Sequence, residues 1–370
     1  MSLANDSSTN SSLSALITGI YTLEGVVQVV GNALLLLTLG LSKPLQRKEY
    51  VLPVGLALGD FLMGVGQLTT GIVRAVLAIR HGSVDPKPAW QCFQSFHVFF
   101  FLVGGLSAAN MMLVISVERL IACATIKTYV AITRTHLRIA VISVYLLGVG
   151  VYIATALGTI LSPDQRTIPG QCPFRLAVPE WTVIFWCFYQ FCVGLLSVLT
   201  YVAALVFLRY RNQGHMTEVL KASRQRQIRV TKTLMFVIFC GLFLHSAPMF
   251  MITASFTDWF QLPSDVVNIA WIMVNANSAN NIFIYLTKSL DMRSAVWNLI
   301  FKCSRGSENS SGAHQHPSKS RRSARRATGG SAWVPPTGTE LKSQKWHRKD
   351  TLIGNAETHS GSQPVLRNSI

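Results

Sequence analysis

Seven apolar stretches, each about long enough to cross a bilayer, run through residues 14–286. A membrane-spanning helix needs about 20 mostly apolar residues to cross roughly 30 Å of hydrocarbon. Helices are the expected form, because lipid offers no partners to the backbone of an isolated strand. The sequence therefore predicts an all-α membrane protein, a seven-transmembrane helix bundle. We expect its spans near residues 14–40, 51–77, 94–122, 137–161, 181–208, 230–256 and 265–286.

The orientation follows from the positions of the basic residues. If the N-terminus is outside, the cytoplasmic segments hold 28 of the 33 Lys and Arg residues and the outer segments hold five. Cytoplasmic loops carry an excess of Lys and Arg, so the N-terminus is predicted to lie outside the plasma membrane. The net charge of +17 then reflects topology and attraction to anionic inner-leaflet lipid. Nucleic-acid binding is not expected, because the basic residues are divided among several loops.

The segment 1–13 is predicted to be an extracellular N-terminal tail. Asn5 and Asn10 each begin an Asn-x-Ser glycosylation sequon on this outer side. No basic leader with a small-residue cleavage site precedes the first span, so we expect that span to start insertion itself.

The segments after the last span differ in composition. Residues 287–303 form an amphipathic stretch that predicts a short helix on the membrane surface, and Cys303 at its end is a palmitoylation candidate. Residues 304–370 are rich in Ser, Gly, Lys and Arg and predict a disordered cytoplasmic tail. Its hydroxyls beside basic runs are candidate phosphorylation sites, or else belong to a plain solvated linker. These hydroxyls are Ser320, Ser323 and Thr328.

Asp60 lies deep in the second span. A carboxylate at the centre of a membrane helix costs about 2.5–3.5 kcal/mol on insertion scales, so it must face the bundle interior. Its candidate partners are Asn32, Asn277, Asn280 and Asn281. One interpretation is a hydrogen-bonded cluster that packs the helices. The other is a switch element or a cation site, in which a structural sodium ion would be the expected occupant.

The third span ends in Glu118-Arg119-Leu120 at the predicted cytoplasmic face. An adjacent acid and base at a membrane edge can pair with each other. Arg119 alone would also be explained as an anchor whose charged end reaches the interface.

The order of motifs along the seven spans is more specific than any one of them. The motifs are Gly31-Asn32, Leu56-Ala57-Leu58-Gly59-Asp60, Glu118-Arg119-Leu120, Tyr201, Pro248, Asn281-Ile282-Phe283-Ile284-Tyr285, and the pair Cys92 and Cys172. Over residues 14–303 the chain resembles the rhodopsin-like (class A) G-protein-coupled receptors. The resemblance implies a disulfide between Cys92 and Cys172. It also implies that Arg119 contacts a heterotrimeric G protein when span 6 swings outward, with Tyr201, Asn281 and Tyr285 restructuring around it.

Several positions depart from that family's pattern. Ile282 replaces the proline of the span 7 motif, Ser246 stands where a tryptophan is expected, and span 4 lacks its tryptophan. In these departures the chain resembles a divergent branch such as the nematode-type serpentine chemoreceptors.

The ligand site is expected by analogy with the same family. Phe101 stands where amine receptors carry an aspartate, and Asn275 where opsins carry the retinal lysine, so neither ligand class is expected. The positions that would line the pocket are Phe101, Gly105, Phe185, Tyr189, Ser246, Phe250, Trp271 and Asn275. This aromatic, uncharged set favours a neutral small molecule as the extracellular ligand. A short peptide remains an alternative, as does simple aromatic packing within the bundle.

The sequence contains no nucleophile motif, phosphate loop or metal-ligand spacing, so we do not expect an enzyme or a metal site. A seven-span transporter is the rival class, but it would be expected to show repeats, broken helices or several buried charges. The expected partners are therefore an extracellular ligand, a G protein, the lipid bilayer, and arrestin and kinases at the tail.

Overall fold

The computed structural model describes residues 5–79, 86–161, 167–168, 170, 172–210, 231, 234–257, 259–288 and 292–299. All of them belong to one compact unit, Met1–His314. A second unit, Gln315–Ile370, lies outside the described residues. The predicted tail 304–370, with Ser320, Ser323 and Thr328, also lies outside them, as do Cys303 and the side chains of Asn5 and Asn10.

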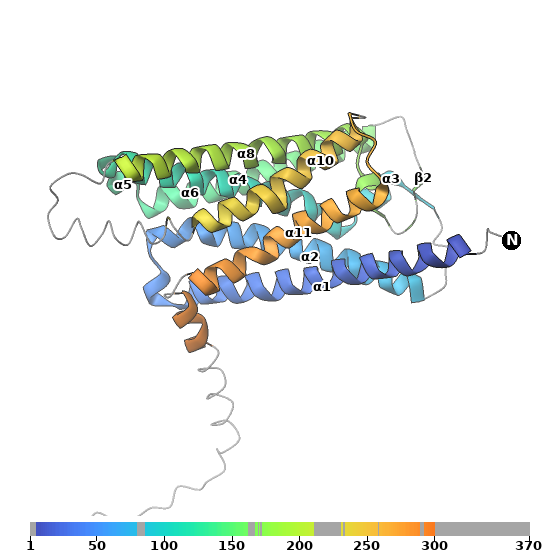
Figure 1. Ribbon diagram of the computed structural model, residues 1–370, viewed down its shortest axis with the longest axis horizontal. Coiled ribbons are helices and arrows are strands. Elements are labelled where there is room, and N and C mark those ends of the chain that lie inside the picture. Colours follow the sequence, from blue (N-terminus) through green and yellow to red (C-terminus); the bar gives the residue numbers. More distant parts are fainter. Residues whose placement is uncertain are drawn as a thin grey trace, which may run out of the picture. The chain divides into compact units, whose positions relative to one another are not determined.

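Long helices dominate the described part of the chain (Figure 1). They are α1 (Asn5–Leu41), α2 (Val51–Ile79), α4 (Phe96–Ala124), α6 (Arg134–Leu161), α8 (Glu180–Tyr210), α10 (Ala247–Phe256) and α11 (Ser264–Lys288). Residues 234–241 are also helical and continue through a π-helical turn, Leu242–Ser246, directly into α10. The helix α1 therefore starts within the segment that was expected to be a tail.

Short elements connect the long helices. On the outer side the strands β1 (Lys87–Pro88) and β2 (Thr167–Ile168) pair antiparallel, with Lys87 opposite Ile168. The other short elements are the 3-10 turns η1 (Lys43–Leu45) and η2 (Lys48–Tyr50) and the helices α3 (Ala89–Phe93), α5 (Ile126–Ala131) and α7 (Phe174–Ala177).

Six helices among the described residues are long and apolar enough to cross a membrane, and they match the first six predicted spans. The seventh, α11, is long enough but more polar. Four of its polar residues are buried within the bundle, since Asn275, Asn277, Ser278 and Asn281 are each at most 3% exposed. A span whose polar face meets other helices can be less apolar overall than one that faces lipid.

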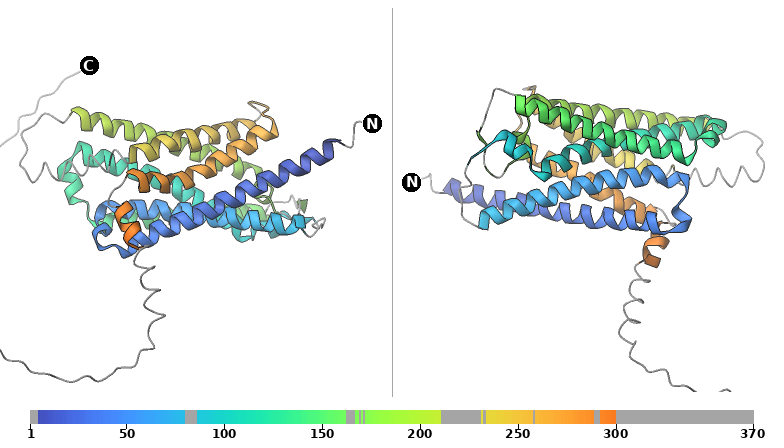
Figure 2. Two further views of the ribbon diagram at one scale, coloured as in Figure 1. Left: turned by 60° about the horizontal axis from the view of Figure 1, so that its bottom comes forward. Right: turned by 180° about the vertical axis from the view of Figure 1, so that it is seen from behind.

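The helix α4 is the most buried of these six spans and packs against α2, α6 and α8. The helix α1 packs against α2 and α11, and Figure 2 shows α1 (dark blue) running beside α2 (lighter blue) in both views. Glycine permits the closest of these approaches. A Cβ atom on Gly104 would lie 2.6 Å from the backbone nitrogen of Met63, and one on Gly25 would lie 2.6 Å from that of Leu68.

The buried apolar side chains form two clusters. The inner core lies at the end that carries the basic loops and includes Leu56, Met111, Tyr201, Val237 and Tyr285. The outer core lies near the disulfide and includes Cys92, Cys172, Trp186, Met249 and Val274.

Residues 292–299 are helical, within the segment predicted to lie on the membrane surface. Met292 is buried and packs against the inner core, while Trp297 is 54% exposed. One face of this helix is therefore held by the bundle, and the other carries an exposed aromatic side chain.

Candidate functional site

A cavity of about 250 Å³ lies in the outer half of the bundle. Its walls come from α1, α2, α4, α11 and the loop that contains Cys172. The lining residues are Ile17, Tyr21, Gln67, Thr70, Arg74, Phe101, Pro173, Phe174, Arg175, Val267, Asn268, Trp271 and Asn275.

The loop over this cavity is fixed at Cys172. A disulfide joins Cys172 to Cys92, with their Cα atoms 5.1 Å apart, as the family resemblance implied. The backbone at Cys172 has a φ of 47°, in the left-handed region that a side chain seldom adopts. His97 Nε2 lies 2.9 Å from the carbonyl oxygen of Cys172 and adds a second hold on the same residue. The next residues, Pro173–Arg175, are thereby placed against the cavity.

Aromatic rings form one wall of the cavity. The ring of Phe174 lies 5.7 Å from that of Phe101 and 5.5 Å from that of Trp186. Trp186 in turn stacks on Trp271 at 5.9 Å. Aromatic pairs at such distances are stabilising beyond the area they bury. This wall is preformed and apolar, which suits the body of a small organic ligand.

Arg74 gives the cavity a positive charge. Its side chain lies on α2, and its Nε is buried without a hydrogen-bond partner. Among the described residues no carboxylate forms an ion pair with it, since the one ion pair there joins Glu118 and Arg119. A half-buried guanidinium without a carboxylate partner favours an anionic group beside it. Arg175, a second lining arginine, packs over the ring of Phe256 at 4.4 Å.

A chain of polar side chains links α1, α2 and α11 beneath the cavity. Gln67 donates a hydrogen bond of 2.8 Å to Glu24, and Gln28 donates one of 3.0 Å to Gln67. Gln28 Nε2 also lies 2.6 Å from the carbonyl oxygen of Asn275. Sequence reasoning missed this chain and treated Asp60 as the one buried carboxylate. Glu24 and Gln28, four residues apart in an apolar span, were the signal that could have revealed it.

The structure brings together three of the residues expected to line the ligand pocket. Phe101, Trp271 and Asn275 line the cavity. Phe185 and Phe250 do not line this cavity, and they are 49% and 39% exposed. On α8 it is Trp186, one position later, that faces the interior, where it packs against the lining residues Phe174 and Trp271.

The other three expected pocket residues lie elsewhere in the bundle and do not line this cavity. A Cβ atom on Gly105 would lie 3.0 Å from the Trp186 ring, which occupies the adjacent space. Tyr189 donates a hydrogen bond of 2.8 Å to Asn110. The hydroxyl of Ser246 packs against Gly194 of α8, where the absence of a side chain leaves room for it. This cavity thus contains three of the eight predicted positions and, unlike that uncharged set, also contains Arg74.

Asp60 is 1% exposed and meets α11 near the middle of the bundle. Asn281 Nδ2 donates a hydrogen bond of 2.8 Å to Asp60 Oδ2. Of the other expected partners, Asn32 donates instead to the carbonyl oxygen of Gln28 on its own helix, at 3.0 Å. The amide oxygen of Asn277 has no hydrogen-bond partner.

Several oxygen atoms around Asp60 are possible ligands of a sodium ion. A hard cation takes oxygen ligands such as carboxylates and amide carbonyls. The amide oxygens of Asn32, Asn277 and Asn281 are buried without hydrogen-bond partners, and Asp60 supplies the negative charge. Asp60 and Asn281, which touch each other, therefore suit such an ion, and its charge would offset that of the buried carboxylate.

Glu118 and Arg119 form a buried ion pair at the inner end of α4. Their residues are 4% and 2% exposed. Arg119 Nη2 donates a hydrogen bond of 3.0 Å to Glu118 Oε1. Nε lies 2.6 Å from Oε2, a close ionic contact that lacks hydrogen-bond geometry. Arg119 is thus turned into the protein and held by its neighbour, rather than reaching out to the interface.

Two tyrosines pack in the same inner core as the residues around this pair. Tyr201 is 1% exposed, and its hydroxyl donates a hydrogen bond to the carbonyl oxygen of Thr231. That bond ties α8 to the segment that leads into span 6. Tyr285 is buried in the same cluster, and its hydroxyl has no hydrogen-bond partner. The inner ends of spans 5, 6 and 7 therefore pack together in the core beside Arg119.

Pro248 and the π-helical turn before it shape span 6. Proline lacks an N–H group, so it leaves a carbonyl of the preceding turn without its helical partner. The turn Leu242–Ser246 widens at this point. Such single widened turns occur mostly at functional positions of helices. Span 6 therefore has an irregular backbone hydrogen-bond pattern between the outer cavity and the inner core, and the helix can bend more easily there.

A further link joins the first two inner loops, and sequence reasoning missed it. Lys48 Nζ donates hydrogen bonds to the carbonyl oxygens of Tyr129 at 2.9 Å and Ile132 at 3.3 Å, and it lies 4.2 Å from the Tyr129 ring centroid. Burial and the nearby Glu118 carboxylate raise the pKa of the Tyr129 hydroxyl, so that it stays neutral. Lys48 thus holds α5 beside the ion pair.

The comparison with known proteins agrees with this geometry. The family model of seven-transmembrane receptors of the rhodopsin family matches residues 31–285. The matched range is more than half of the chain and contains Asp60, the Glu118–Arg119 pair, Tyr201 and the disulfide. No curated protein is similar enough to match the chain. The chain therefore belongs to the rhodopsin family of seven-transmembrane receptors, which are multi-pass membrane proteins that signal on ligand binding and are not enzymes.

Proposed function

We propose that this receptor binds a small extracellular molecule with an anionic group in the outer cavity. The observation that carries the proposal is Arg74, a lining cation that has no carboxylate partner among the described residues. The apolar body of the ligand would lie on the aromatic wall of Phe101, Phe174 and Trp271, and its anionic group would bond to Arg74. The neutral ligand expected from the sequence depended on positions that mostly lie outside this cavity.

The size of the cavity favours a small molecule over the peptide alternative. Its volume of about 250 Å³ is below the range of roughly 300–1,000 Å³ typical of pockets for drug-sized ligands. The loop residues Pro173–Arg175 close against it. A peptide would have to displace this loop, which the disulfide and His97 hold in place.

Signalling is proposed to pass through a heterotrimeric G protein at the inner end. Arg119 would be released from Glu118 when span 6 moves away from α8, which requires the bond between Tyr201 and Thr231 to break. Asn281 and Tyr285 would rearrange with it, because Asn281 bonds Asp60 and Tyr285 lies in the inner core. Arrestin and kinases acting on the tail are proposed as further partners. A plasma-membrane location with the N-terminus outside is supported by the basic inner loops.

The placement among nematode-type serpentine chemoreceptors is also a proposal. Its support is the replacement of motif residues, and the structure gives a packing reason for one of them. A Cβ atom on Gly31 would lie 2.8 Å from the Ile282 side chain, so Ile282 fits because α1 has a glycine opposite it. A chemoreceptor role agrees with a small, preformed cavity.

The test compares small carboxylic acids of increasing apolar length with their methyl esters in cells that express the full chain. We expect acids to raise second-messenger output and esters to be inactive. Arg74→Gln should raise the half-maximal acid concentration by about 10–100-fold, because a hydrogen bond to a charged group contributes about 1.5–3 kcal/mol. Lys87→Gln removes an outer cation that does not line the cavity, and it should leave the response unchanged at matched surface expression.

Equal responses to acids and esters would contradict the anionic-ligand proposal, as would an unchanged response in Arg74→Gln. Direct binding of purified receptor to a G protein, measured without ligand, tests the signalling proposal separately.

A further inference from the structure

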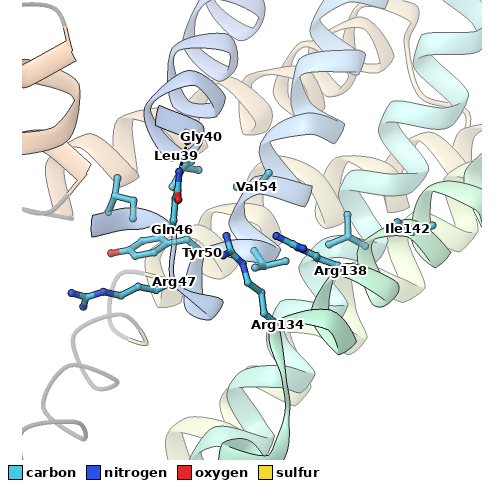
Figure 3. Close-up of a pocket in the computed structure, with 12 residues that line it drawn as sticks. Leu39, Gly40, Gln46, Arg47, Tyr50, Val54, Arg134, Arg138 and Ile142 are labelled. Carbon is cyan, nitrogen blue, oxygen red and sulfur yellow. Dashed lines mark hydrogen bonds between the residues drawn. The ribbon is translucent and has the colours of Figure 1, made fainter. Parts of the chain in front are cut away.

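A second cavity lies at the inner end of the bundle, between the first inner loop, α2 and α6 (Figure 3). Its volume is about 530 Å³. The lining residues are Leu39, Gly40, Leu45, Gln46, Arg47, Tyr50, Val51, Val54, Arg134, Arg138, Val141 and Ile142. None of them belongs to the ligand cavity or to the Glu118–Arg119 site, so the cavity requires its own explanation.

The cavity gathers positive charge. Arg134 and Arg138 lie one turn apart on α6, so their side chains share a face of the helix. Figure 3 shows both guanidinium groups pointing from α6 toward the first inner loop, while Arg47 extends from that loop away from α6. Among the described residues none of the three forms an ion pair with a carboxylate. Two like charges one helical turn apart repel each other, and a bound anion would remove that repulsion.

Lys48, the basic residue next to Arg47, does not point into this cavity. Lys48 lies between Arg47 and Tyr50 in sequence, but its ammonium group is bonded to the carbonyl oxygens of Tyr129 and Ile132. The amide of Gln46 is likewise used, because Nε2 donates a hydrogen bond of 2.7 Å to the carbonyl oxygen of Gly40. The charged donors that remain in the cavity are therefore the arginines, whose planar groups suit the oxygens of a phosphate.

The remaining wall is apolar and continues onto the face of α6 that meets lipid. Val54, Val141 and Ile142 line the cavity. Ile142 is 58% exposed, and along the same helix Ile139 and Leu146 are also exposed. Apolar side chains exposed on a membrane span are expected to meet acyl chains. The cavity thus presents arginines beside a surface that is suited to hydrocarbon.

We propose that this cavity binds one anionic phospholipid of the inner leaflet. The phosphate oxygens accept hydrogen bonds from Arg134 and Arg138, and Arg47 adds charge at the rim. One acyl chain lies along Val141 and Ile142. Basic pockets between membrane helices on the cytoplasmic side are suited to anionic headgroups, and a free phosphate would use only the arginines. The apolar wall is the reason to assign a lipid rather than a soluble phosphate.

The experiment measures lipid binding to the purified full chain in detergent by native mass spectrometry, with phosphatidylserine and phosphatidylcholine as probes. We expect a phosphatidylserine adduct that outcompetes phosphatidylcholine. The double variant R134Q/R138Q should lower phosphatidylserine affinity on the order of tenfold or more, and each single variant about fivefold, because each basic residue near the headgroup contributes comparably. The single variants keep the test possible if the double variant does not fold.

The control is R209Q/R293Q, which removes two exposed basic residues at the same end of the bundle, outside the cavity. It should retain the wild-type affinity. Equal losses in the two double variants would overturn the proposal, since general surface charge would then explain binding, and so would unchanged binding in R134Q/R138Q. Full displacement of the lipid by inorganic phosphate or by soluble glycerophosphoserine would overturn its assignment to a lipid. None of these measurements depends on the receptor's ligand or G protein.

Discussion

The outer and inner halves of the bundle are built from the same helices but are packed differently. The outer half encloses a cavity bordered by aromatic rings, with Arg74 in its wall and a disulfide-bound loop beside it. The inner half is closed around an ion pair, Glu118–Arg119, and is filled by aliphatic and methionine side chains and three tyrosines. One end therefore has a site ready for a ligand, while the other hides the residue expected to act on the G protein.

This difference indicates that activation would require free energy mainly in the inner half, where contacts must be broken. The outer cavity is already formed between the helices and the loop beside it. Exposure of Arg119 requires separating a buried ion pair and breaking the bond from Tyr201 to the segment that precedes span 6. The polar contacts of Asp60 with α11, and the π-helical turn before Pro248, lie between the two halves. They are the elements through which the outer half can influence the inner one.

The largest effect on stability and signalling is expected from substitution of Arg119 in the inner half. Arg119→Ala leaves Glu118 buried without its partner, which costs about 3–5 kcal/mol when one member of a buried pair is removed. Signalling should be lost as well, because the proposed contact with the G protein is gone. Basal second-messenger output and the thermal midpoint of purified protein measure the two effects at matched surface expression. Val117→Ala, on the lipid-facing side of α4, is the control, and retained signalling in Arg119→Ala would contradict the assignment.

The variant Cys172→Ser is expected to disturb the outer half of the bundle, because it removes the disulfide. Loss of a native disulfide typically costs about 2–5 kcal/mol, and here it frees the loop beside the cavity. We expect lower surface expression and weaker ligand binding, while the Glu118–Arg119 pair is unaffected. Cys192→Ser, which replaces an exposed free cysteine, should behave as wild type. Normal expression and ligand response without the disulfide would show that the outer cavity is held by the helices alone.

The connection between the halves is tested with Asn281→Ala. Removal of the amide takes away the hydrogen bond that Asn281 donates to the buried Asp60 carboxylate, which is expected to cost about 1.5–3 kcal/mol. Thermal melting in sodium chloride and in choline chloride measures the stability and any sodium dependence. If sodium binds at Asp60, the wild type should melt higher in sodium and the variant should lose that difference. Asn280→Ala, on the same helix, is the control variant. Equal melting temperatures of the wild type and both variants would show that Asn281 does not link the two halves.

The smallest effect is expected at the edge of the inner half. Lys48→Ala removes the bonds to the second inner loop and the contact with the Tyr129 ring, which contributes about 0.5–1 kcal/mol at such sites. The thermal midpoint should fall slightly, and hydrogen exchange should increase in residues 126–131 rather than around the outer cavity. Lys43→Ala, an exposed lysine on the neighbouring turn, should have no effect. Increased exchange at both ends would mean that the two halves are not independent.

Much of the inner half could be predicted from the sequence. Glu118, Arg119, Tyr201 and Tyr285 lie at regular helical positions near the predicted cytoplasmic ends of their spans, and the structure places them together in or beside one core. Asp60 was found because a carboxylate is rare in an apolar span. Its choice of Asn281 over Asn32 depends on the rotation of α1 and α11, which hydropathy does not encode.

The outer half was predicted less well, for a physical reason. The expected pocket assumed that Phe185 and Phe250 face the interior. On α8, however, Trp186 takes that place, and the change of a single residue turns a helical side chain by about 100°. Arg74 lies within the predicted span 51–77, but its position in the sequence did not show that its side chain turns toward the cavity.

The sequence by itself determined that the chain spans a membrane seven times, which end carries the basic loops, and which motifs the spans hold, because hydrophobicity and charge act on each segment separately. The tertiary structure alone decided which side chains meet: the pairing of Asp60 with Asn281, the polar chain from Glu24 to Asn275, the arginine-lined cavity on α6, and the charge beside the ligand. Those contacts depend on how each helix is rotated and how closely glycines let it approach its neighbours, and side chains from several helices set both together.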